Sequence, residues 1–444
     1  MVLVAHAEDD NRCRVPEGRH TSLLRGVWST IRNVRLPFRL GALAGVVATA
    51  ILTVTAAPQL DPQAARWVAA TLEGMTLDQK VGQLIMPSFR STYLSSDSDV
   101  YDELVSRVHE QHVGGFLLFG GREPAPDVLL NAGYSRSVLG QPLAAASVAN
   151  RLQAISALPL LNSADFETGV GFRIGGATTF PRAMAFGAAG DDRLAFEAGR
   201  ITALEARALG IHVNFAPVAD VNNNPRNPVI NTRSFGEDPA MVARLAAAYV
   251  RGLTEGGMIA TLKHFPGHGG ATADSHTTLP VLTETLAELE DRDLAPFATA
   301  VEAGAPSVMI GHLDVEAIAP GVPSSLAPET YAYLREELGF EGVAITDSLG
   351  MGAVAGTPAL AVKALQAGAD LLLMPADTRR AHQTITRALD DGSLDRARVE
   401  EAAARVVALQ RWQARTAQDR PVDDSVVEKA EAASAALREA AYGY

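Results

Sequence analysis

The 444-residue sequence contains a single cysteine, Cys13. One cysteine excludes an intrachain disulfide and any zinc site built from several thiolates. Basic residues are also in deficit, because 38 Lys and Arg face 51 Asp and Glu and give a formal net charge of −13. With no basic stripe in the body of the chain, broad attraction to nucleic acid is not expected. A neutral substrate, or an anionic one bound locally, fits this balance better.

Several motifs of other enzyme classes are missing. No glycine-rich dinucleotide fingerprint follows the first candidate strand, and neither a phosphate-binding loop nor the elbow of serine hydrolases is found. The zincin pattern His-Glu-x-x-His is absent. His264 and His268 have the i, i+4 spacing of a helical ligand pair, but Pro266 and Gly267 between them argue against a helix. We therefore expect no metal and no cofactor.

The N-terminal segment differs from the rest of the chain. Residues 1–39 are rich in arginine, and an apolar run over 40–54 follows, with small residues up to 57. This order is typical of a signal peptide or of an uncleaved signal anchor, and the run of about 15 residues is short for a span of roughly 20. The positive charge before the run predicts a cytoplasmic leader over 1–39 and an extracytoplasmic body, secreted or anchored through 40–57.

From Asp61 onward, apolar runs alternate with amphipathic segments. Most of the runs are continuous rather than alternating, as strands buried on both faces are. Eight strands are predicted, over 81–87, 113–119, 158–164, 211–218, 258–264, 307–312, 342–347 and 370–374. Helices are predicted between several of them, over 193–209, 239–255, 286–303 and 328–338.

Alternating strands and helices predict right-handed parallel units. Eight such units favour an α/β fold with a single (β/α)8 TIM-like barrel, and an open doubly wound sheet is the alternative. Residues 61–444 would form this domain, with a C-terminal helical tail from about 379. Residues 120–143, which are rich in Pro, Gly and Ser, are expected to form an insertion near the barrel mouth.

Polar residues follow several of the predicted strands at the point where each strand ends. Functional residues of a parallel barrel gather at these carboxyl ends. The residues in question are Asp165, Asp220, Arg233, Lys263, His264, His312 and Asp347. After Lys263 and His264 comes a loop too rich in Gly and Pro to be helical, carrying Asp274 and His276. A histidine beside a carboxylate on such a loop is a plausible proton carrier.

Each of these residues also has a structural interpretation. Asp347 is either a nucleophile or stabiliser of a cationic carbon, or the N-cap of a following helix. Asp165 either accepts from paired hydroxyl groups or caps a loop. Arg233 is followed by Glu237 and Asp238 and could form an ion pair with them. Lys263 and His264 are harder to explain structurally, because a buried charge needs a partner.

A set of short segments resembles family 3 glycoside hydrolases, specifically the bacterial β-N-acetylglucosaminidases. The resemblance covers roughly residues 64 to 390, and Thr168 departs from the glycine usual in the family. The segments are MTLDQKVGQL at 75–84, Asp-x-Glu at 165–167, FPxxMA at 180–185, NFAPVAD at 214–220, RSFGEDP at 233–239, KHFPGHG at 263–269, DSH at 274–276 and Thr-Asp at 346–347.

By resemblance, Asp347 is the nucleophile and His276, paired with Asp274, is the acid/base on a mobile loop. The resemblance also implies that Asp165, Arg233, Lys263 and His264 grip the sugar hydroxyls and the N-acetyl group. The expected reaction is retaining hydrolysis of terminal N-acetylglucosamine from cell-wall glycans through a glycosyl–Asp347 intermediate.

Three alternatives stay open from the sequence. A neutral histidine in place of a second carboxylate repels an incoming phosphate less than a glutamate would, which allows phosphorolysis. Another family 3 specificity, such as β-glucosidase, is the second alternative, and a non-catalytic glycan-binding barrel is the third.

Overall fold

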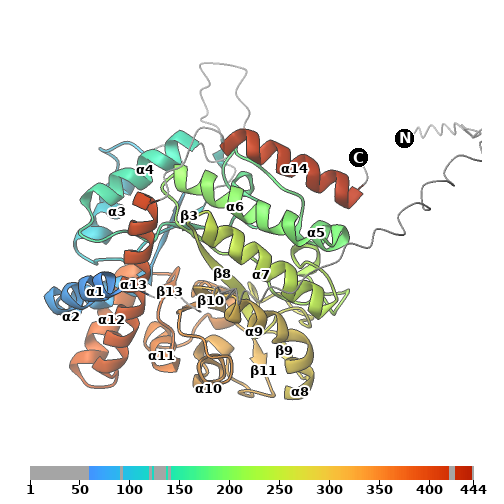
Figure 1. Cartoon of the computed structure of the whole chain (residues 1–444). Coiled ribbons are helices and arrows are strands. Elements are labelled where there is room, and N and C mark those ends of the chain that lie inside the picture. Colours follow the sequence, from blue (N-terminus) through green and yellow to red (C-terminus); the bar gives the residue numbers. More distant parts are fainter. Residues whose placement is uncertain are drawn as a thin grey trace, which may run out of the picture. The chain divides into compact units, whose positions relative to one another are not determined.

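Parallel strands form the centre of the molecule, and their register is fixed by backbone pairing (Figure 1). The computed structural model describes residues 60–90, 94–119, 123–124, 137–138, 142–419 and 426–442. The N-terminal segment 1–57, with its predicted leader and anchor, and most of the 120–143 insertion lie outside these residues. Among the helices that are described, none has the length and apolar character needed to cross a bilayer.

Seven strands make one parallel sheet in the order β12-β10-β8-β7-β6-β3-β2. Their residues are almost all buried, which is why the sequence shows continuous apolar runs rather than alternation. The strands are β2 (Ser88–Arg90), β3 (Leu117–Phe119), β6 (Ser163–Ala164), β7 (Val213–Asn214), β8 (Ile259–Phe265), β10 (Ser307–Ile310) and β12 (Val343–Thr346).

A second parallel pair closes the ring. Strand β1 (Ile85–Met86) pairs with β13 (Leu372–Leu373), and a bridge between Ile345 and Leu371 joins β13 to β12. Pro87 separates β1 from β2, so the two are halves of one interrupted strand that pairs on both sides. Eight strand positions therefore form a closed ring, and the predicted barrel is confirmed over the open sheet.

The first predicted strand, 81–87, is wrong in its first half. Residues 77–83 form helix α2 (Leu77–Gln83), and the strand begins only at Ile85. A capping box explains this, because the Thr76 side chain accepts from the Gln79 amide while the Gln79 side chain accepts from the Thr76 amide. The capped start carries the helix through Val81, whose apolar character alone suggested a strand.

Helices cover the outside of the barrel (Figure 1). Before and between the first strands lie α1 (Pro62–Gly74), α3 (Asp99–His109), α4 (Pro142–Ile155), α5 (Ala183–Ala189) and α6 (Asp192–Ala208). Further along are α7 (Pro239–Glu255), α8 (Leu286–Glu288), α9 (Ala295–Glu302), α10 (Pro328–Ala332), α11 (Leu360–Ala367) and α12 (Thr378–Asp390). The helices predicted over 286–303 and 328–338 are present but each contains a wider π-helical turn, at Leu289–Asp293 and Tyr333–Glu337.

Two short strand pairs lie in the loops outside the barrel sheet. The parallel pair β9 (Val281–Leu282) and β11 (Asp314–Val315) joins the loops after β8 and β10. Within the 120–143 insertion, the antiparallel pair β4 (Glu123–Pro124) and β5 (Ser137–Val138) is described, and the last two residues of the insertion begin α4.

The predicted helical tail is present and packs on the barrel. Helix α13 (Arg396–Asp419) lies at the amino ends of the strands, where Gln410 donates to Gln83 at 2.7 Å and to the Gly114 carbonyl at 3.2 Å. Buried Asp370, just before β13, accepts from Arg398 of the same helix at 2.6 Å. Helix α14 (Val426–Tyr442) packs on α5 and α6 (Figure 1). Within the tail, α13 thus lies at the amino ends of the strands, opposite their carboxyl ends, and α14 packs on helices of the outer layer.

Candidate active site

A cavity of about 380 Å³ opens at the carboxyl ends of the strands. It is lined by Leu117, Phe119, Asp165, Glu167, Phe172, Arg173, Arg182, Phe215, Val229, Arg233, Lys263, His264, Ser275, His276, Met309, Asp347, Ser348, Met351, Leu373 and Met374. Six of the seven residues predicted for the site are among them, and the seventh, Asp274, is hydrogen-bonded to His276. Charged groups lie beside apolar walls here, as in small-molecule sites generally.

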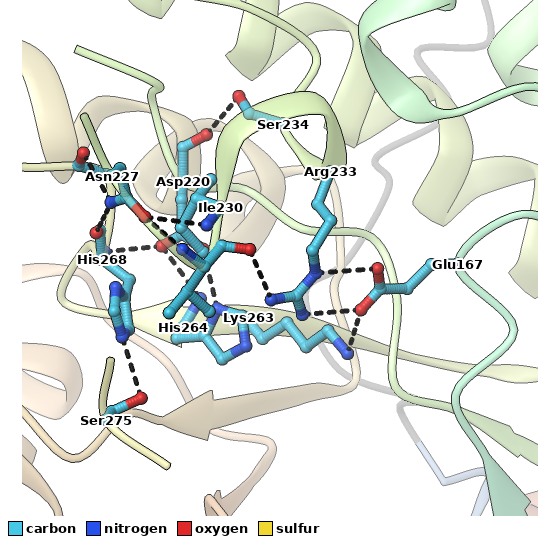
Figure 2. A network of polar contacts seen from close by, with 12 residues as sticks. Glu167, Asp220, Asn227, Ile230, Arg233, Ser234, Lys263, His264, His268 and Ser275 are labelled. Carbon is cyan, nitrogen blue, oxygen red and sulfur yellow. Dashed lines mark hydrogen bonds and ion pairs between the residues drawn. The ribbon is translucent and has the colours of Figure 1, made fainter. Parts of the chain in front are cut away.

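One wall of the cavity holds a cluster of charged side chains, of which Lys263 is buried and the others are partly buried (Figure 2). The Lys263 ammonium lies 2.8 Å from Asp165 Oδ1 and 2.8 Å from Glu167 Oε1. Arg233 makes a two-pronged contact with Glu167, at 2.7 and 3.0 Å. Arg173 completes the cluster with an ion pair to Asp165 at 3.1 Å. The alternative in which Arg233 pairs with its sequence neighbours Glu237 and Asp238 is therefore wrong, since its partner comes from 66 residues earlier in the chain.

The cluster keeps its members charged. Burial alone would raise the pKa of Glu167, but the positive charges of Lys263 and Arg233 outweigh it and hold the pKa well below its ordinary value. Burial likewise opposes the charge on Lys263, and its two carboxylate neighbours raise the pKa of that ammonium above the usual value. Asp165 and Glu167 each pair with two cations, but the side chain of Asp165 is 19 % exposed and that of Glu167 only 9 %, so Asp165 is the more accessible acidic group of this wall.

Behind the cavity, Asp220 fixes His264. The Asp220 carboxylate is fully buried and lies 2.7 Å from His264 Nδ1, and it also accepts from the amides of His264 and His268 at 3.1 and 2.7 Å (Figure 2). Burial would raise the pKa of Asp220, yet the two histidines and the His268 amide lower it. Because the ionised carboxylate can only accept, His264 carries its proton on Nδ1 and presents Nε2 toward the cavity.

Asp347 lies at the end of β12 and faces the cavity. Burial raises the pKa of its carboxyl, but His312, His264 and the Ser348 amide outweigh that effect and lower it, so the group is ionised at neutral pH. The Ser348 amide donates to Asp347 Oδ1 at 2.7 Å. The N-cap interpretation is wrong, because the next helical turn, Gly352–Val354, is preceded by Met351 and has no side-chain cap. An ionised carboxylate therefore lines the cavity.

The loop after β8 brings Asp274 and His276 to the same cavity. Asp274 Oδ1 lies 2.7 Å from His276 Nδ1 and accepts from the His276 amide at 2.9 Å. Burial raises the pKa of Asp274, but these hydrogen bonds lower it overall. The side chain of His276 is 63 % exposed, so its Nε2 is accessible to a ligand and to solvent. The carboxylate of Asp347, at the end of β12, and the imidazole of His276, in the loop after β8, therefore line the same cavity.

The chain matches the family described as "Glycosyl hydrolase family 3 N terminal domain" over residues 76–409, which is most of its length. The chain belongs to glycosyl hydrolase family 3. In the described residues, no three His, Cys, Asp or Glu side chains are grouped so as to hold a metal ion. The resemblance read from the motifs is confirmed at the level of the family.

Relatives of this family 3 chain have named activities. Beta-hexosaminidase A of Pseudoalteromonas piscicida is 33 % identical over 375 residues, covering 76 % of this chain and 61 % of the relative. A beta-N-acetylglucosaminidase/beta-glucosidase of Cellulomonas fimi is 32 % identical over 81 % of this chain and 62 % of the relative. This chain thus spans about three fifths of the length of these curated relatives.

A solved structure is similar as well. The family 3 β-N-acetylglucosaminidase of Paenibacillus sp. str. FPU-7 matches with a TM-score of 0.72 and 36 % sequence identity, covering 83 % of this chain and 69 % of that one. The comparison supports the barrel fold of this family 3 chain independently of the sequence motifs.

Several contacts around the site were not predicted from the sequence. Glu167 was quoted only as part of a motif, and its role as the counter-ion of Lys263 depends on a contact between strands far apart in the chain. His268 reaches Ser275 Oγ at 3.0 Å, and buried His312 lies 2.7 Å from Ser325 Oγ and 2.9 Å from the Ser348 carbonyl. The sequence feature that could have predicted these contacts is a polar residue within an apolar segment, since a buried imidazole needs hydrogen-bond partners.

Proposed function

We propose that this family 3 chain is a retaining exo-β-N-acetylglucosaminidase. The observation that carries the proposal is that Asp347 and His276 line one cavity together with the charged wall of Asp165, Lys263 and Arg233. The names of the Pseudoalteromonas and Cellulomonas relatives and of the Paenibacillus structure support the same reaction class. In this class an enzyme removes one sugar at a time from a chain end.

In the first chemical step, Asp347 attacks the anomeric carbon of the bound sugar. The glycosidic bond breaks as the new bond to the carboxylate forms, and His276 Nε2 gives its proton to the departing oxygen. In the second step the neutral imidazole takes a proton from water, whose oxygen displaces Asp347 and yields the free sugar with its original configuration. Asp274 orients the ring and stabilises the imidazolium.

The charged wall would bind the non-reacting part of the sugar. Asp165 can accept from two neighbouring hydroxyl groups, Lys263 and Arg233 can donate to hydroxyl and N-acetyl oxygens, and the unprotonated Nε2 of His264 can accept from a hydroxyl group. Phe119 and Phe215 add apolar surface to the same cavity. Binding energy from these contacts would position the anomeric carbon over Asp347.

Mechanism-based trapping tests the nucleophile. A fluorinated N-acetylglucosamine analogue with an activated leaving group should label the protein once, on the peptide that contains Asp347. Asp347→Asn, which keeps the shape but removes the charge, should not be labelled. Labelling of another carboxylate, with Asp347 unmodified, would overturn the assignment of the nucleophile.

Two substrate comparisons test the reaction class. Hydrolysis of an aryl N-acetylglucosaminide should exceed that of the matching aryl glucoside, and the reverse order would favour a β-glucosidase. Adding phosphate should change neither the rate nor the product. Formation of a sugar 1-phosphate would show phosphorolysis instead. A wild-type protein that binds N-acetylglucosaminides but turns none of them over would favour a non-catalytic glycan-binding barrel.

The role of His276 has its own test. His276→Ala should reduce kcat/KM for substrates with poor leaving groups by about 10²–10⁴-fold, the usual contribution of general acid catalysis. Activated aryl substrates should lose far less, because their leaving groups need no proton. Equal losses on both substrate types would contradict an acid role.

We further propose that the substrate is a cell-wall fragment and that the protein acts outside the cytoplasm. The N-terminal pattern of basic leader and apolar run supports export, and N-acetylglucosamine is a unit of bacterial cell-wall glycans. Fractionation of cells producing the full chain should recover it in membranes or medium. Recovery in the cytoplasm alone would contradict export, and inactivity on purified cell-wall fragments would contradict the substrate.

A further inference from the structure

The loop that carries Asp274 and His276 is folded mainly on itself. The Asp274 side chain accepts from the His276 amide, and the Asp274 carbonyl accepts from the amides of Thr277 and Thr278, each at 3.0 Å. These contacts make one tight turn but do not attach the turn to the barrel. From 272 to 278, Ser275 is the one buried residue, with 2 % of its surface exposed. The attachment must therefore come from Ser275 and from the backbone.

His268 holds the turn from the barrel side (Figure 2). Its Nε2 lies 3.0 Å from Ser275 Oγ, and its ring is 1 % exposed. The backbone of His268 is fixed in turn, because its amide donates to Asp220 at 2.7 Å and its carbonyl accepts from Asn227 at 2.8 Å. Burial and the nearby His264 lower the pKa of His268 to about 4, so the ring is neutral at neutral pH.

The loop that follows the nucleophile holds the turn from the other side. The first amides of a helical turn have no partner within the turn, and here they donate outward. Gly352 N–H donates to the His276 carbonyl at 2.9 Å and Ala353 N–H to the Ser275 carbonyl at 3.3 Å. A Cβ on Gly352 would lie 2.6 Å from the Thr277 carbonyl oxygen and 2.8 Å from that of His276, so contact this close requires glycine.

We propose that His268 and Gly352 are positioning residues that clamp the acid/base turn from its two sides. The proposal rests on the hydrolase function above, with His276 as acid and Asp347 as nucleophile. Because Gly352 lies five residues after Asp347, the clamp joins the loop of the nucleophile to the loop of the acid. The turn is thus docked on the element whose chemistry it assists, and loosening either side moves His276 relative to the scissile oxygen.

Two glycines in one loop provide a matched pair of variants. Gly352→Ala should push the turn away, whereas Gly350→Ala should not, because the atoms nearest a Cβ on Gly350 are 3.6 Å away. A misplacement of about 1 Å can cost about 10²-fold in rate. We expect Gly352→Ala to lower kcat/KM for a disaccharide or alkyl N-acetylglucosaminide about 10- to 100-fold. For an activated aryl N-acetylglucosaminide the loss should stay within about 3-fold, and Gly350→Ala should leave both values unchanged.

Substitutions on the other side give an independent test. Ser275→Ala and His268→Leu remove the hydrogen bond and should show the same selective loss on poor leaving groups. Ser275→Thr keeps the hydroxyl, and His268→Gln keeps a polar atom near the position of Nε2, so both should recover most of the activity. Parameters are compared as kcat/KM, which reports the step that forms the glycosyl–enzyme.

Trapping by the fluorinated analogue separates a failure of the clamp from a failure of the proposed function. If the clamp is correct, Gly352→Ala is still labelled on Asp347 at close to the wild-type rate, because the activated leaving group needs no acid. Equal losses on both substrate types, or equal behaviour of the variants at Gly350 and Gly352, overturn the clamp. A wild-type protein that neither hydrolyses N-acetylglucosaminides nor is labelled overturns the proposed function instead. Should Gly352→Ala fail to fold, the Ser275 pair decides.

Discussion

The charged wall of the cavity predicts unequal costs for removing its members. Three cations, Lys263, Arg233 and Arg173, face two carboxylates, Asp165 and Glu167. Without Lys263, each carboxylate still has an arginine and the charges balance. Without the charge on Glu167, three cations share Asp165 alone. Glu167→Gln should therefore destabilise the fold more than Lys263→Met, although Lys263 is 3 % exposed and contacts both acids.

Magnitudes follow from these contacts. Leaving a buried charge unpaired costs about 3–5 kcal/mol, whereas losing hydrogen bonds to charged groups costs about 1.5–3 kcal/mol. The roughly 330 residues of the family domain imply an unfolding entropy of ~0.7 kcal/mol/K. The expected Tm losses are then about 4–7 °C for Glu167→Gln and about 2–4 °C for Lys263→Met.

Thermal unfolding at pH 7 measures which of the two variants loses more Tm, and Glu205 offers a matched control. Glu205 accepts from the amide and hydroxyl of Thr178 rather than from a cation, and burial raises its pKa, so Glu205→Gln should change the Tm little. The depressed pKa of Glu167 gives stability above the unfolded value of about 4.3, which is lost as pH falls below it. The Tm gap between wild type and Glu167→Gln should therefore narrow below pH 4. A greater loss of Tm at pH 7 for Lys263→Met than for Glu167→Gln would refute the argument from the balance of charges.

Three further predictions follow. Asp370→Asn should lower the free energy of unfolding by about 3–5 kcal/mol, because Arg335, Arg398 and Arg405 all bind this buried carboxylate. It should leave kcat/KM at 25 °C unchanged, because Asp370 lies at the end of the barrel opposite the cavity. A fall in kcat/KM of the folded variant would contradict this. Asp220→Asn should raise KM, because the side-chain amide of the new Asn can donate to His264 Nδ1, where the carboxylate only accepts, and would move the His264 proton to Nε2. An unaltered NMR signal of the His264 ring would exclude this tautomer change. With the His268 pKa lowered to about 4 by burial, the unfolded chain binds the extra proton between about pH 6.5 and 4. Stability should therefore fall as pH drops through this window, and less so in His268→Gln.

Motifs and periodicity predicted much of this protein correctly. Continuous apolar runs predicted parallel strands buried on both faces, and their alternation with helices predicted the barrel. Boundaries were less reliable where two local signals competed, as at Val81, where the capping box at Thr76 extended a helix into an apolar run. Polar residues after the strands predicted many of the side chains that reach the cavity, because parallel strands bring their carboxyl ends to one face; Asp220 and His312 are the two that do not line it.

Partners between distant segments could not be predicted in the same way. Arg233 has acidic neighbours in sequence, yet it binds Glu167, because the loops that follow the paired strands β6 and β7 bring the two side chains together. Likewise, nothing near Ser275 in sequence predicts that Gly352 and Ala353 donate to its turn.

The sequence by itself determined the strands, the family and the identity of most site residues, because hydrophobic periodicity and short motifs are local properties of the chain. Only the tertiary structure decided which charges pair, which imidazoles are buried and neutral, and which loop supports His276. Those properties depend on distances of a few ångströms between residues far apart in the chain, and closure of the barrel sets those distances.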